Sequence, residues 1–191
     1  MSTQPKTYLT PEQYLEIERA AEYKSEYLNG EMFAMSGARE PHNLIAGNAY
    51  AHLHQQFRTR PCRVYTSDMR VRVGRTGLYT YPDVTVVCGA PQFLDDVTDT
   101  LLNPHIIIEV LSPSTEACDR GRKFEHYKSI ESLREYLLLA SDRMHADLYI
   151  RQPDDRWLLT SADALEDSLT LESVGVRLKL ADLYEKVELD G

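Results

Sequence analysis

Three features that mark other protein classes are scarce or missing in this sequence. Its cysteines number only 3 and have no Cys-x-x-Cys spacing, which excludes a zinc finger and argues against a disulfide framework. No apolar run has the length of a membrane span, and residues 1–7 lack the apolar core of a signal peptide. No glycine-rich phosphate loop occurs. We therefore expect Cys62, Cys88 and Cys118 to be reduced thiols in a cytoplasmic protein without membrane association.

The chain also has few positive charges for its number of negative ones. It contains 21 Lys and Arg and 30 Asp and Glu, which give a net charge of −9. Nucleic-acid-binding proteins usually carry a basic surface, so this balance argues against non-specific binding. Basic residues nevertheless gather in two stretches: Arg58, Arg60, Arg63, Arg70, Arg72 and Arg75, and then Arg120, Arg122, Lys123 and Lys128. The arginines of the first stretch are either solvent-exposed along a strand edge or part of a surface that binds nucleic-acid phosphates.

The hydrophobic content of 42% and charged content of 27% are typical of one globular domain, here residues 1–191. A capping box at Thr10-Pro11 begins a helix, and Asn29-Gly30 predicts a hairpin. We expect the next elements to be a helix over 41–57, strands at 62–66, 69–73, 82–88 and 105–111, a helix over 116–130, a strand at 135–140, a hairpin of 146–150 with 157–160, and a helical turn at 181–184. This order predicts a mixed α/β (α+β) fold, with a mixed sheet flanked by helices and additional hairpins.

The most informative feature is a carboxylate inside an apolar strand. Glu109 lies within His-Ile-Ile-Ile-Glu-Val-Leu, and its burial without a partner would cost several kcal/mol. Asp83 begins a second apolar run, Pro-Asp-Val-Thr-Val-Val-Cys. Side chains alternate along strands, so two neighbouring strands would let Asp83 and Glu109 converge at one end of the sheet. Such a carboxylate pair can hold Mg²⁺ or Mn²⁺.

Lys123, on the predicted helix that follows, completes a set suited to phosphodiester hydrolysis. A bound ion would polarise the phosphoryl oxygen, and the ammonium would stabilise the developing negative charge. Each residue also has a purely structural interpretation. Asp83 can end a strand, Glu109 can pair with an internal arginine, and Lys123 can be a solvated helix lysine.

These residues resemble a known family. The similar segments are Pro82-Asp83, Ile107-Ile-Glu-Val-Leu-Ser-Pro-Ser-Thr115, Asp119, Lys123, Tyr127, Glu135-Tyr136, Asn29-Gly30-Glu31 and Pro41-His42. They are similar to the Uma2 family of endonucleases in the PD-(D/E)XK nuclease superfamily. The resemblance implies a restriction-endonuclease-like core with Asp83 and Glu109 as metal ligands. It also implies an acidic residue from an earlier element, for which Glu31 is the candidate. His42 is either a capping or core histidine or, by this resemblance, a ligand, base or phosphate contact.

One position departs from the superfamily pattern, which has a lysine two residues after the glutamate. This chain has Leu111 there, and Lys123 is the expected replacement. The expected function is a metal-dependent DNA endonuclease, acting as a homodimer because duplex cleavage needs two sites. Two alternatives stay open. The acidic charge and Leu111 favour a catalytically weak module that binds DNA or protein, and a metal phosphoesterase for small nucleotides is the other.

Overall fold

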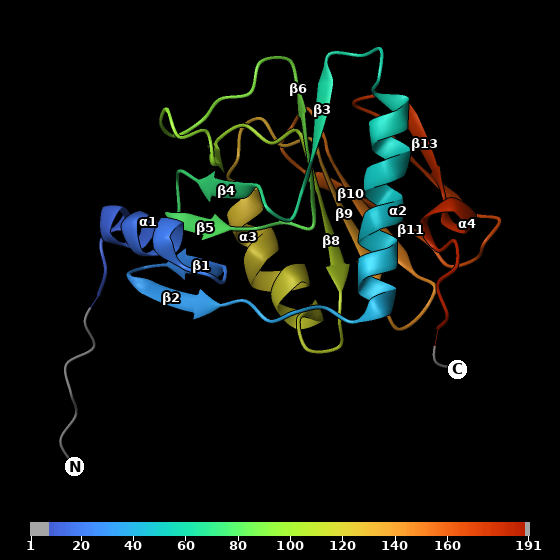
Figure 1. Cartoon of the computed structure of the whole chain (residues 1–191). Helices are drawn as coiled ribbons and strands as arrows, with labels where there is room; N and C mark the ends of the chain where they lie inside the picture. The colour runs from blue at the N-terminus through green and yellow to red at the C-terminus, as the bar shows by residue number, and fades with distance from the viewer. Residues whose placement is uncertain (1–7, 190–191) are drawn as a thin grey trace.

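The computed structural model describes residues 8–189 and contains a six-stranded mixed sheet at its centre (Figure 1). Its strands in spatial order are β11 (Trp157–Ala162), β10 (Ala146–Arg151), β9 (Glu135–Ala140), β8 (Ile106–Leu111), β6 (Val84–Cys88) and β3 (Cys62–Thr66). β8 and β9 run parallel, whereas the other neighbours run antiparallel. Residues 1–7, which carry the argument against a signal peptide, lie outside the described part, as do residues 190–191.

A second, five-stranded sheet lies beside the first. Its strands in spatial order are β2 (Glu31–Ala34), β1 (Ser25–Leu28), β5 (Leu78–Thr80), β4 (Arg70–Val73) and β7 (Thr100–Leu101). β12 (Ser168–Leu171) and β13 (Val176–Lys179) form a separate hairpin. The sequence pattern did not predict β5, β7, β12 or β13. These strands have only 2 to 4 residues, too few for an alternating pattern to stand out.

The helices cover the sheets and separate them. α1 (Pro11–Ala20) begins with the predicted capping box and packs on β1 and β5 through Tyr14, Tyr27 and Tyr79. α2 (Glu40–Gln56) covers the outer face of the six-stranded sheet, together with α4 (Leu180–Leu183) (Figure 1). Among residues 8–189, no helix is long and apolar enough to cross a membrane.

The helix expected over 116–130 is shorter and changes its winding. A π-helical segment, η1 (Cys118–Lys123), runs directly into α3 (Phe124–Tyr127). These two segments lie between the two sheets, with Phe124 and Tyr127 in the core that the sheets share (Figure 1). π-Helical turns are rare and occur often at functional sites.

The two faces of β8 contact different cores, as the alternation predicted. Ile106 and Ile108 pack under α2, whereas Ile107 and Leu111 pack toward α3 and the five-stranded sheet. Glu109 lies on the second face because it alternates with Ile108. The fold therefore directs this carboxylate toward η1 and α3.

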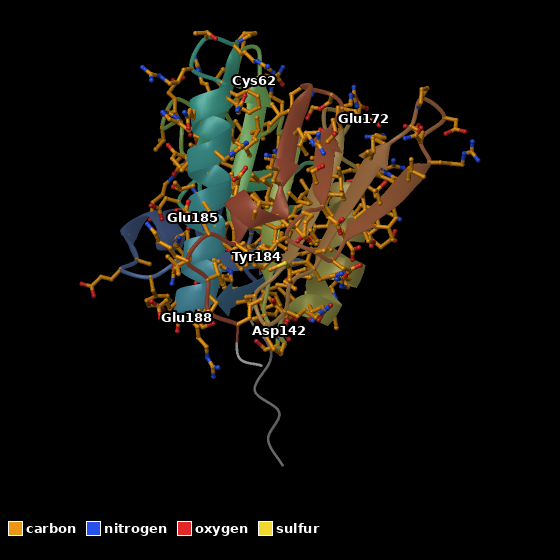
Figure 2. All side chains as sticks on the ribbon, turned by 90° about the vertical axis from the view of Figure 1, so that its right-hand side faces the viewer. Cys62, Asp142, Glu172, Tyr184, Glu185 and Glu188 are labelled. Carbon is orange, nitrogen blue, oxygen red and sulfur yellow. A yellow bond between two sulfur atoms is a disulfide. The ribbon has the colours of Figure 1, made fainter. Side chains whose placement is uncertain are left out.

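The prediction of reduced thiols is wrong for two of the cysteines. Cys62 and Cys88 are directly opposite each other on β3 and β6 and form a disulfide, whereas Cys118 is free and exposed. A separation of 26 residues gives no sign of strand register, so spacing could not reveal this pair. The cysteine argument for a cytoplasmic protein no longer holds. Cys62 and Asp142, which follows β9, lie at opposite ends of the molecule (Figure 2).

Candidate active site

Asp83 and Glu109 come together at one end of the six-stranded sheet. Val84 pairs with Ile108 across β6 and β8, so the next pair outward sets Asp83 opposite Glu109 on the same face. The backbone N–H of Val110 donates to Asp83 Oδ2 at 2.7 Å, which holds this carboxylate against β8. Glu109 is only 4% exposed. The predicted convergence on adjacent strands is therefore present.

Lys123 points into the same site rather than toward solvent. Its Nζ lies 3.2 Å from Glu109 Oε1 and 3.1 Å from Glu26 Oε1. Asp119, on the same face of η1, is 3.4 Å from Nζ through Oδ1. The Tyr127 hydroxyl donates to Glu109 Oε1 at 2.8 Å. Lys123, from the helical segment that follows β8, thus places a positive charge beside Glu109, where the apolar Leu111 provides none.

His42 reaches the site from the first turn of α2. Its Nε2 lies 3.2 Å from Asp83 Oδ2, and its Nδ1 is buried without a hydrogen-bond partner among residues 8–189. Burial disfavours the charged imidazole, but the contacts with Asp83 outweigh this and raise the pKa of His42. His42 is therefore placed to orient the Asp83 carboxylate.

The early acidic residue in the site is Glu26, not Glu31. Glu31 begins β2 beside the hairpin turn and does not line the cleft described below. Glu26 lies on β1, accepts a hydrogen bond from Thr80 and faces Lys123. Glu26 was not among the predicted site residues, and Asp119 was named only as part of the family resemblance. The position of Asp119 four residues before Lys123, on the same helix face, was a usable indication.

An open cleft of about 940 Å³ leads to these side chains. Asp83, Glu109 and Lys123 form its floor, and segments 33–39 and 112–115 contribute to its walls. Pockets of roughly 300–1,000 Å³ are typical for small ligands and cofactors. The carboxylates are therefore accessible to a ligand even though Glu109 itself is buried.

Negative charge exceeds positive charge at the floor of the cleft. Burial raises the pKa of Glu109 to about 8, since the lowering by Lys123 is opposed by Asp119 and Asp83. Burial likewise raises the pKa of Asp119 despite Lys123. Lys123 also loses solvent, but Glu109, Glu26 and Asp119 outweigh that loss and hold its pKa well above its ordinary value. One ammonium does not neutralise these carboxylates when all are ionised, so the cluster either keeps a proton on Glu109 or takes up a further cation.

The donor set fits a hard divalent ion that retains water. Mg²⁺ is usually held by one or two carboxylates and keeps its remaining positions for water and substrate oxygens. Asp83 and Glu109 are such a pair. Within residues 8–189, no group of three or more His, Cys, Asp or Glu side chains is arranged to hold a metal ion. This chemistry fits Mg²⁺ or Mn²⁺ better than a structural zinc ion.

The arginine-rich stretch lies away from this cleft. Arg70 is only 3% exposed and donates to Thr100, Tyr81 and Asp99, so it is not on a solvated edge. Arg60 donates to the Val174 carbonyl near the other end of α2. None of the six arginines between 58 and 75 lines the cleft. The hypothesis of a phosphate-binding surface beside the site therefore gains no support from the residues that line the cleft.

The structure thus has a mixed sheet with two carboxylates and a lysine at one end. The structure is similar to the crystal structure of "a putative nuclease belonging to DUF820" from Anabaena variabilis, with a TM-score of 0.77. That match covers 94% of this chain and 99% of the other at 19% sequence identity, so it shows the fold alone. The predicted fold class is confirmed.

Sequence comparison identifies the family. The Uma2 family model, described as "Putative restriction endonuclease", matches residues 11–181, and the chain therefore belongs to the Uma2 family. It is 35% identical to the uncharacterized protein slr1290 of Synechocystis sp. over 176 residues, 92% of this chain and 91% of that protein. It is also 36% identical to the uncharacterized protein sll1609 of the same organism over 152 residues, which cover 80% of this chain and 86% of that protein. Family and fold together support a nuclease.

Proposed function

We propose that this chain is a Mg²⁺- or Mn²⁺-dependent nuclease that hydrolyses phosphodiester bonds in nucleic acid, with DNA as the expected substrate. The observation that carries the proposal is the excess of carboxylates around Lys123 at the floor of an open cleft. A purely structural ion pair would be expected to balance its charges, because uncompensated buried charge is costly. A divalent ion supplies the missing positive charge.

The proposed roles follow from the contacts of each side chain. Asp83 and Glu109 would hold the ion, which when bound polarises the phosphoryl oxygen and makes a water molecule more acidic. Lys123 would donate to a phosphate oxygen and stabilise negative charge in the transition state. Tyr127 would orient Glu109 through its hydrogen bond, and His42 would orient Asp83 through the 3.2 Å contact described above.

Substitution of the two carboxylates by their amides tests the proposal. Asp83→Asn and Glu109→Gln should each abolish Mn²⁺-dependent plasmid nicking and weaken Mn²⁺ binding in calorimetry, because each loses a charged ligand while keeping its shape. Circular dichroism should show an intact fold. Asp155→Asn is the matched control, since Asp155 is exposed and pairs with Arg151 outside the cleft. Unchanged Mn²⁺ binding by both amide variants would make the carboxylates structural.

The same preparations distinguish the alternative function. Strong nucleic-acid binding with no nicking in Mn²⁺ would favour a catalytically weak binding module. The homodimer stays a prediction based on the two sites that duplex cleavage requires. Sedimentation equilibrium of the wild-type chain tests it directly.

A further inference from the structure

Phe33 directs an aromatic ring into the cleft beside the charged floor. β1 and β2 run antiparallel, and Phe33 is directly opposite Glu26. Residues opposite each other in such a pair project from the same face of the sheet. The Glu26 carboxylate contacts Lys123, and Phe33 itself lines the cleft. The ring therefore lies one strand away from the proposed reaction centre.

About half of the surface of this ring is open to solvent, and no other ring in the described part of the chain stacks on it. Phe33 is 48% exposed and belongs to none of the hydrophobic clusters found in residues 8–189. Among the large apolar side chains exposed there, only Phe33 lines the cleft. Its position is thus different from that of a scattered surface hydrophobe.

The wall that continues from Phe33 suits a nucleotide strand. Residues 34–38, Ala-Met-Ser-Gly-Ala, are uncharged and line the cleft up to Arg39. Arg39 is exposed at the start of α2 and forms no ion pair among the described residues. An aromatic ring and a guanidinium that line the same cleft combine a surface for a base with a contact for a phosphate.

We propose that the cleft takes an unpaired nucleic-acid strand, either single-stranded or a flap, with Phe33 stacked on a base. That base is next to the phosphate that Lys123 contacts, and Arg39 contacts a neighbouring phosphate. The inference rests on the proposed function and narrows its substrate class. Bases inside a duplex have no free face for a ring, whereas every unpaired base has one. The cleft, about 940 Å³, also matches a few nucleotides better than the broad interface of a duplex reader.

A two-way comparison of protein and ligand tests this proposal. Fluorescence anisotropy in Ca²⁺ would measure the binding of a short single strand, the same strand with abasic sites, and the blunt duplex. Wild type should bind the single strand at least about fivefold more tightly than the abasic strand, the scale of one stacked base. Phe33→Ala should lose that factor on the normal strand and lose nothing on the abasic strand. Phe33→Trp should restore it.

Tyr23→Ala is the matched control, because Tyr23 is an exposed aromatic that does not line the cleft, and it should bind as wild type does. Equal affinities of wild type and Phe33→Ala for the normal strand would overturn the inference while leaving the nuclease proposal intact. The inference would also be overturned if wild type bound the duplex more tightly than the single strand. It would likewise be overturned if Phe33→Ala lost self-association without a change in its affinity for the single strand. Failure of wild type to bind any of the three ligands or to cleave would overturn both proposals.

Discussion

Two clusters of charged side chains in this molecule differ in their balance. The Arg70 cluster (Arg19, Arg70, Asp95 and Asp99) has two arginines for two aspartates and ties α1 and β4 to the segment that precedes β7. The Lys123 cluster (Lys123, Glu26, Glu109 and Asp119) has one ammonium for three carboxylates. Members of the second cluster line the cleft, whereas no member of the first does.

The pKa values of the acids follow this difference. The Arg19 guanidinium, with help from Thr100 and Arg70, holds the pKa of Asp99 well below its usual range despite partial burial. Glu109 has its pKa raised, because burial and neighbouring carboxylates outweigh Lys123. A balanced cluster is complete in the folded chain and stabilises it. The unbalanced cluster keeps a raised pKa at Glu109 and lines a cleft, and these two differences are the reason that we assign the proposed cation to it.

Removal of the ammonium from the unbalanced cluster should have the largest effect. Lys123→Ala should lower plasmid nicking by about a hundredfold or more, the scale for loss of one transition-state donor. Its Mn²⁺ affinity should stay the same or rise, because an ammonium is not a ligand and repels the ion. Lys128→Ala is the control, since Lys128 pairs with Glu125 on the same helical segment outside the cleft. Unchanged nicking by Lys123→Ala would make Lys123 a bystander, and loss of folding would make it a structural counterion.

Breaking the balanced cluster should affect stability and not metal binding. Arg70→Met should lower the free energy of unfolding by about 3 kcal/mol, because it removes the buried guanidinium that pairs with Asp99 and donates to Thr100 and Tyr81. Urea denaturation measures this change, and calorimetry should give the wild-type Mn²⁺ affinity. Arg156→Met, which removes an exposed pair with Asp154, should cost less than about 1 kcal/mol. Weaker Mn²⁺ binding by folded Arg70→Met would contradict the separation of the two clusters.

The disulfide lies at the end of β6 away from Asp83, so its loss should leave the cleft unchanged. Cys62→Ser should lower the free energy of unfolding by about 2 kcal/mol, the low end for native disulfides, because strand pairing already holds the segment. Nicking rate and Mn²⁺ affinity should equal those of wild type. Cys118→Ser is the control for loss of a thiol. A reduced metal affinity in Cys62→Ser would show that the two ends of the sheet are coupled.

The pH dependence of stability tests the unbalanced cluster in a different way. Glu109 has a pKa of about 8 in the folded state against 4.5 as its ordinary value, so the folded chain keeps a proton that the unfolded chain loses. This contribution to stability is full below the lower value and is lost as pH rises through the higher one. From about pH 5 to about pH 8, the free energy of unfolding of the metal-free wild type should fall by about 3 kcal/mol more than that of Glu109→Gln. Urea denaturation in EDTA measures the difference, and identical pH profiles would assign the proton to another group.

Much of the site could be predicted because its information is local. Glu109 stood out as a charge within an apolar strand, and alternation put it on the face opposite Ile108. Asp83 followed from the start of a second strand, and Lys123 from the helix after the glutamate strand. The hairpin at Asn29-Gly30 could also be predicted from local sequence, because both residues have a positive φ, which this dipeptide readily adopts.

Other features depended on contacts between distant segments. The choice of Glu26 over Glu31 depended on how the first hairpin packs against β5 and η1, which no local pattern expresses. The Cys62–Cys88 bond depended on the register of β3 and β6. The burial of Arg70 depended on Tyr81 and Asp99, which come later in the sequence and accept hydrogen bonds from its guanidinium.

The sequence by itself determined the strand and helix that present Glu109 and Lys123, because side-chain alternation and helix periodicity act over a few residues. Only the tertiary structure decided how many charges surround each of them. Charge balance depends on distances between elements, and burial strengthens every such interaction by removing water. For that reason one cluster became a structural tie and the other a cleft that favours a cation.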